Sequence, residues 1–186
     1  MFTASNIHYD FAERTRGFAH GGIGLMHDWA RRLDLPGAID RRLHLLQIHL
    51  PVHESAHVLN FAYNVLCEGH CLQDIELRRT DEVFLDARGA RRIPDPTTAG
   101  DVCRRFRVGD IQTLQEVSHE TRLKVWAQQL AALFTQAAID MDGTLVETTG
   151  QCKQGMDIAY DGTWAYHPLV LTLANTGEVL SLVNRR

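Results

Sequence analysis

The chain has 186 residues, which is enough for one full domain or for a small domain and part of another. Its 45% apolar and 23% charged residues are typical of a globular protein in water, and no apolar run is long enough to span a bilayer. The formal net charge of −4 excludes a uniformly basic nucleic-acid coat. Because the first ten residues lack the basic and apolar regions of a secretory signal, we expect a cytoplasmic protein with no membrane partner.

Apolar residues at three- and four-residue spacing predict a helical region over residues 1–135, after a first arm or weak strand at 1–20. Trp29 and Trp126 are expected between packed helices. Thr97 or Thr98 should cap one helix, because a threonine followed three residues later by Asp101 approximates a capping box. The predicted helices are 23–33, 36–43, 54–67, 72–77, 81–87, 97–106 and 109–135.

The third of these helices has an obvious apolar pattern. Its predicted inward side chains are Val58, Leu59, Ala62, Val65 and Leu66. Gly69 is the expected stop, since glycine is favoured just after a helix end.

Past residue 136 the pattern changes to the two-residue period of β-strands. Turn signals at Asp161-Gly162 and Asn175-Thr176-Gly177 separate the later strands. The strands predicted are 137–146, 156–160, 166–174 and 179–183, joined in chain order as an antiparallel meander. The predicted fold class is therefore α+β, with helices over 1–135 and sheet over 136–186.

The first predicted strand carries two acids on one face. Asp140 and Asp142 are two residues apart, so their side chains point the same way, opposite to Ile139 and Met141. Neighbouring carboxylates repel each other in water. They become useful beside a divalent cation or a phosphoryl group.

Two further clusters of residues each have a structural interpretation as well as a functional one. Cys67 and Cys71 lie one helical turn apart with His70 between them, but the chain has no second short-spaced pair, so we interpret them as small half-buried thiols rather than zinc ligands. Six arginines stand against two aspartates over residues 88–107, which fits either a local basic face or a solvated surface.

The string Asp140-Met141-Asp142-Gly143-Thr144-Leu145 resembles the first motif of haloacid-dehalogenase-type phosphatases. This alternative implies Asp140 as nucleophile and Asp142 as general acid/base, with magnesium between substrate and carboxylate. That family usually carries the motif near the start of a parallel α/β domain, whereas helices precede it and hairpins follow it here.

Another similarity extends over most of the chain. It is carried in order by residues 63–66 (YNVL), 74–79 (DIELRR), 93–101 (IPDPTTAGD), 140–144 (DMDGT), 150–155 (GQCKQG), 160–169 (YDGTWAYHPL) and 173–178 (LANTGE). Together these segments resemble the N-terminal region of bacterial insertion-sequence transposases with a group 1 DDE domain.

This resemblance implies an RNase H-like catalytic domain after a helical DNA-binding region. Such enzymes hold two Mg²⁺ or Mn²⁺ ions with Asp, Asp and Glu, and they cleave and join DNA strands. Asp142, directly before Gly143-Thr144, is the first choice for the metal ligand and catalytic acid, and Asp140 is the second. The strand and helix that would carry the other two acids are not in the sequence, so we expect a truncated RNase H-like domain at 136–186 that is inactive alone. A non-catalytic DNA-binding product is the alternative.

The implied partner is double-stranded DNA, at transposon ends and at the target, and the resemblance leaves a homodimer open. Backbone amides of Thr97 and Thr98 would meet DNA phosphates at a helix start. Positive charge for the same partner would come from Arg104, Arg105, Arg107 and Lys153.

Overall fold

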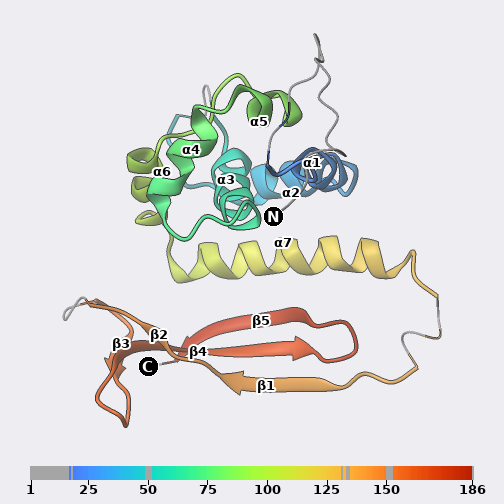
Figure 1. Ribbon diagram of the computed structural model, residues 1–186. Helices are drawn as coiled ribbons and strands as arrows, with labels where there is room; N and C mark the ends of the chain where they lie inside the picture. The colour runs from blue at the N-terminus through green and yellow to red at the C-terminus, as the bar shows by residue number, and fades with distance from the viewer. Residues whose placement is uncertain are drawn as a thin grey trace, which may run out of the picture. The chain divides into compact units, whose positions relative to one another are not determined.

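A computed structural model describes residues 17, 19–48, 52–130, 132, 135–149 and 153–185 (Figure 1). It combines helices with an antiparallel sheet, which confirms the α+β class. Two compact units, Met1–Leu114 and Gln115–Arg186, divide the chain. Most of the arm predicted at 1–20 lies outside the described residues.

The helices occur where the apolar periodicity predicts them, but some differ in length: the one predicted at 97–106 ends at Cys103, and the one predicted at 72–77 is a 3₁₀ turn followed by a helix that ends at Arg79. The last was expected to reach residue 135, but it ends at Trp126. The elements are α1 (Ile23–Arg32), α2 (Leu35–Arg42), α3 (Glu54–Leu66), the 3₁₀ helix η2 (Leu72–Asp74), α4 (Ile75–Arg79), α5 (Glu82–Ala87), α6 (Pro96–Cys103) and α7 (Val108–Trp126). None of the described helices has both the length and the apolarity that a membrane crossing requires.

A single apolar core joins α1, α3, α4, α5 and α6. Phe84 of α5 is its largest fully buried side chain, with 1% of its surface exposed. Burying a side chain of this size contributes about 1.5–3 kcal/mol. The other buried members are Ile23, Leu59, Tyr63, Cys67, Ile75, Ile93 and Ala99.

Of the five side chains predicted to point inward from α3, Leu59 is buried, Val58 is half-buried, and the other three are exposed. Val65 and Leu66 are 68% and 54% exposed, and the buried face carries Glu54, His57, Asn60 and Asn64 beside Leu59 and Tyr63. Three of these polar side chains, Glu54, Asn60 and Asn64, bind the backbone of neighbouring loops. Glu54 Oε1 accepts from the amides of Leu45 and Leu46, both at 3.0 Å, and Asn64 Nδ2 donates to the Cys71 carbonyl at 3.0 Å. Loop backbone needs such partners when buried, so they replace apolar side chains on this face.

The end of α3 also differs in detail from the prediction. Glu68, rather than Gly69, has the positive φ of 63°. The Gly69 amide donates to the Asn64 carbonyl at 2.8 Å and the Glu68 amide to that of Val65 at 3.0 Å, which is a Schellman motif. Gly69 is needed for space, because a Cβ there would collide with the Asn64 side chain.

All other strands pair with β4, which runs antiparallel to each of them. β4 (Trp164–Leu173) has ten residues and is flanked by β1 (Ile139–Gly143) and β2 (Val146–Glu147) in line on one edge. On its other edge lie β3 (Met156–Ile158) and β5 (Glu178–Arg185). The predicted meander is therefore wrong in one respect: β1 pairs directly with β4, and β3 does not lie between them. β4 is long enough for two short strands to pair end to end along each edge.

From Gln115 onward, α7 belongs with the sheet (Figure 1). The Gln115 side-chain amide binds the outer edge of β5: Nε2 donates to the Leu182 carbonyl at 3.1 Å, and Oε1 accepts from the Leu182 amide at 3.3 Å. Arg122 donates to the Val179 carbonyl further along the same edge. These contacts cover backbone groups that an edge strand would otherwise leave open to pairing with another chain.

Neither tryptophan lies in a helix–helix core, so that prediction is wrong. Trp29 is 49% exposed on α1. Trp126 is half-buried, and its Nε1 donates to the Glu178 carboxylate of β5 at 2.9 Å. The indole N–H requires a partner when buried, which favours a polar strand end over an apolar helix face.

Candidate functional site

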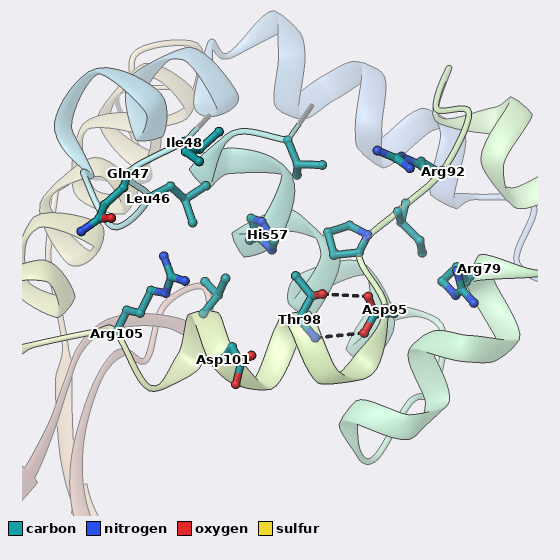
Figure 2. A pocket seen from close by; sticks show the side chains of 14 residues that line it. Leu46, Gln47, Ile48, His57, Arg79, Arg92, Asp95, Thr98, Asp101 and Arg105 are labelled. Carbon is teal, nitrogen blue, oxygen red and sulfur yellow. Dashed lines mark hydrogen bonds between the residues drawn. The ribbon is translucent and has the colours of Figure 1, made fainter. Parts of the chain in front are cut away.

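Two adjoining hollows mark the surface of the helical unit. The first has a volume of about 520 Å³ and the second of about 560 Å³, and Gln47 and Arg105 line both. The first lies between α3, α6 and the 46–48 segment (Figure 2). Its lining consists of Leu46, Gln47, Ile48, Val52, His57, Arg79, Arg92, Ile93, Pro94, Asp95, Thr98, Asp101, Val102 and Arg105. The second is lined by His44, Leu45, Gln47, Arg104, Arg105, Arg107 and Asp110.

The start of α6, at the floor of the first hollow, is capped by Asp95. Its carboxylate accepts from the Thr98 amide at 3.0 Å and from the Thr98 hydroxyl at 2.7 Å, and Pro96 occupies the first helical turn. The prediction of Thr97 or Thr98 as cap is therefore wrong, because Asp-Pro supplies both a side-chain acceptor and a preset φ. The two hydrogen bonds from Thr98 lower the pKa of Asp95, which stays charged. A phosphate at this helix start would meet that negative charge.

The arginines of the hollows differ in how their charge is balanced. Arg104 pairs with Asp101 at 2.6 Å, and Arg79 pairs with Glu76 at 2.9 Å. Arg92 and Arg105 have no carboxylate partner within the described residues, and Arg105 makes only a 3.4 Å contact with the Leu45 carbonyl. The first hollow therefore contains two arginines of uncompensated charge.

His57 of α3 faces this hollow from its inner side. The residue is 4% exposed, and no described residue forms a hydrogen bond with its Nδ1. Burial is the main cause that lowers the pKa of His57; Arg105 lowers it further, and Glu54 opposes both. The ring is thus neutral near pH 7.

The two acids of β1 lie in the sheet unit. Asp140 pairs in register with Thr172 and Asp142 with Val170, so both carboxylates lie on one face of the sheet. Both are exposed, and no hydrogen bond or ion pair engages either of them within the described residues. This leaves their oxygens available to a hard cation. Across the described part of the chain, no group of three potential metal ligands comes together.

The predicted DNA-binding residues are separated by the fold. Arg104, Arg105 and Arg107 are brought together in the second hollow, and Thr98 lines the first. Thr97 is exposed and lines neither. Lys153 belongs to the sheet unit, where its Nζ donates to the Thr148 hydroxyl at 2.7 Å.

Sequence reasoning missed three residues of the first hollow: His57, Arg79 and Arg92. Arg92 belongs to the arginine-rich segment and could have been selected from it. His57 could not be selected from the sequence, because the apolar pattern of α3 predicts an inward face that does not include it.

The cysteine pair has two different environments. Cys67 is fully buried in the core, and burial raises the pKa of its thiol. Cys71 is exposed, with its Sγ 3.4 Å from an oxygen of Asp74. Cys152 lies outside the described residues.

Comparison with family models, with curated proteins and with solved structures finds no match to this chain.

Proposed function

We propose that this chain is part of a DDE transposase of an insertion sequence, which binds double-stranded DNA and holds Mg²⁺ or Mn²⁺ on β1. The observation that carries the proposal is the pair of unengaged carboxylates, Asp140 and Asp142, on one face of β1. β1 is the first strand of an antiparallel sheet that follows a helical unit. This is the order of parts that the sequence resemblance implies.

The chemistry of the donor set suits a hard cation. Mg²⁺ takes one or two carboxylates together with water and substrate phosphate oxygens. When bound, the metal would activate water or a DNA 3′-hydroxyl and stabilise the leaving oxygen. Asp142 is the ligand we place first, since it directly precedes Gly143-Thr144, and Asp140 is either a second ligand or the group that orients Asp142.

The helical unit would supply the DNA contacts. Arg104, Arg105 and Arg107 are exposed and converge on the second hollow. Guanidinium groups suit the phosphate backbone, and such contacts fix position on DNA without reading its sequence. Duplex affinity should then fall steeply with added salt, because each neutralised phosphate releases counterions.

Two alternatives differ from this proposal in specific ways. The phosphatase resemblance implies a parallel α/β domain, whereas β1 pairs antiparallel with β4 over its whole length, from Ile139 to Gly143. A DNA-binding product without catalysis would bind duplex DNA and would not need metal at β1.

Metal binding tests the proposal most directly. Titration of Mn²⁺ followed by the loss of its free electron-paramagnetic-resonance signal should show a site that Asp142→Asn weakens at least tenfold. Asp157→Asn, at an exposed position on β3, is the matched control and should change little. Equal Mn²⁺ affinity in the wild type, Asp140→Asn and Asp142→Asn would refute the metal site. Hydrolysis of p-nitrophenyl phosphate that depends on Asp140 would favour the phosphatase instead.

A further inference from the structure

The size of the first hollow limits what can occupy it. Its volume of about 520 Å³ falls within the range of about 300–1,000 Å³ that is usual for small-ligand sites. A B-form duplex, whose major groove alone is about 12 Å wide, does not fit into such a space. A single nucleotide does.

The unpaired positive charges of the first hollow lie at its two ends. Figure 2 shows Arg92 and Arg105 on opposite sides of His57, and both lack a carboxylate partner within the described residues. Between them the floor carries the carboxylates of Asp95 and Asp101. Asp101 is paired with Arg104 at 2.6 Å, so Asp95 is the carboxylate that repels an anion from the middle, while Arg92 and Arg105 attract anions at both ends. This pattern fits a ligand with two separated phosphates better than one with a single phosphate.

The middle of the hollow suits an uncharged, partly apolar group. Leu46, Ile48 and Val52 form an apolar wall. His57 lines the same hollow; it is 4% exposed, and its Nδ1 has no hydrogen-bond partner within the described residues. An unsatisfied buried polar group costs about 1–3 kcal/mol, and a ligand hydrogen bond would remove that cost.

We propose that the first hollow binds one nucleotide with a phosphate on each side, held by Arg92 at one phosphate and Arg105 at the other, with the base beside His57. This chemistry is shared by an unpaired nucleotide within a DNA strand and by a free nucleoside 3′,5′-bisphosphate. Binding of an unpaired nucleotide within a DNA strand rests on the proposed DNA function, whereas binding of a free nucleotide does not. Arg105 also lines the second hollow, so a strand leaving this site would continue toward Arg104 and Arg107.

The test uses the full chain and deoxythymidine 3′,5′-bisphosphate as the probe, with binding measured by isothermal titration calorimetry. We expect the bisphosphate to bind at least tenfold more tightly than thymidine 5′-monophosphate. Arg92→Ala and Arg105→Ala should each reduce its affinity at least tenfold, to that of the monophosphate. Arg91→Ala is the matched control, since Arg91 is exposed, adjacent in sequence and outside the hollow, and it should change affinity less than twofold.

Three results would overturn the site: no binding of the bisphosphate at millimolar concentration, equal affinity for the two nucleotides, or the same loss in Arg91→Ala as in Arg92→Ala. Arg92 and Arg105 are exposed, so a circular-dichroism melt should show that their variants fold. Displacement of the bisphosphate by single-stranded oligothymidylate would identify a DNA strand as the source. Retention of the bisphosphate against that oligonucleotide would identify the free nucleotide.

A second pair of variants separates this inference from the proposed function. Duplex binding, followed by fluorescence anisotropy, should fall in Arg104→Ala and Arg107→Ala while bisphosphate binding stays within twofold. Duplex binding without bisphosphate binding would refute the nucleotide site alone. Bisphosphate binding without duplex binding would refute the DNA function and leave a free-nucleotide site.

Discussion

In the helical unit, Glu54, Asn60 and Asn64 are buried and hydrogen-bonded to loop backbone, whereas in the sheet unit the candidate acids lie on an open strand. Glu54 is 2% exposed and fully engaged with loop amides. Asp140 and Asp142, by contrast, are exposed and unengaged within the described residues. The first arrangement shapes a surface hollow that several segments build together. In the sheet unit, strand alternation alone places the two carboxylates on one face, so the geometry of the pair depends on few other residues.

The core that supports the hollow should be the most sensitive part of the chain. Phe84→Ala removes a side chain that is 1% exposed and should cost about 3–5 kcal/mol of unfolding free energy. Met141→Ala on β1, where the side chain is 64% exposed, should cost far less. Urea unfolding followed by circular dichroism measures both. Similar losses in the two variants would contradict the contrast between the units.

Substitution of the buried Glu54 should have the next largest effect on the free energy of unfolding. Glu54→Ala leaves the amides of Leu45 and Leu46 without their acceptor and should cost about 1–3 kcal/mol. Glu54→Gln keeps one acceptor oxygen and should cost less. Because Leu46 lines the first hollow, Glu54→Ala should also weaken ligand binding there, as measured by calorimetry. Unchanged stability in Glu54→Ala would show that these hydrogen bonds do not hold the hollow wall.

The third largest expected effect comes from Asp95, the cap of α6, which contributes both to stability and to the charge at the helix start. Asp95→Ala should cost about 1 kcal/mol, because the Thr98 amide loses its side-chain acceptor. Asp95→Asn keeps an acceptor and removes the charge, so it should retain most of the stability. If DNA phosphate approaches this helix start, Asp95→Asn should raise duplex affinity in a fluorescence-anisotropy assay. An unchanged affinity would place the phosphate contacts at the arginines alone.

The two units also differ in how much of each can be predicted from sequence. Strand alternation identifies the shared face of Asp140 and Asp142, because a strand's side-chain period does not depend on its partners. The strand order does depend on them: β4 pairs with β1 only because ten residues offer room for two strands along each edge. A local pattern does not contain that information.

In the helical unit, periodicity locates the helices but not their inward faces. On α3 the buried positions are chosen by loop backbone that Glu54, Asn60 and Asn64 bind. Those loops are distant in sequence, so the apolar pattern selected Val65 and Leu66 instead. The hollow depends on this face, and for that reason His57 could not be predicted as part of a site.

The pH dependence of stability provides the last and smallest contrast. Burial, aided by Arg105 and opposed by Glu54, lowers the pKa of His57 below the ordinary 6.5. As the pH falls through about 6.5, His57 therefore gains a proton in the unfolded chain but stays neutral in the folded chain. Acid consequently favours unfolding. The contribution of neutral His57 is complete above this pH and is lost as the pH falls, with a slope below about 1.4 kcal/mol per pH unit for one proton. His27, whose pKa burial also lowers, should add a second such contribution in the same unit.

Urea unfolding of the wild type and of His57→Gln at pH 7.5, 6.5 and 5.5 measures this slope. The variant should lose less stability than the wild type over the same interval, because only His27 still resists protonation. Ligand binding supplies an independent check, since a phosphate bound at Arg105 would offset the positive charge that lowers the pKa of His57. The bisphosphate should then bind more tightly at pH 5.5 than at pH 7.5 in the wild type, and with less pH dependence in His57→Gln. Parallel stability slopes in the two proteins would show that His57 is not held neutral by its place beneath the hollow.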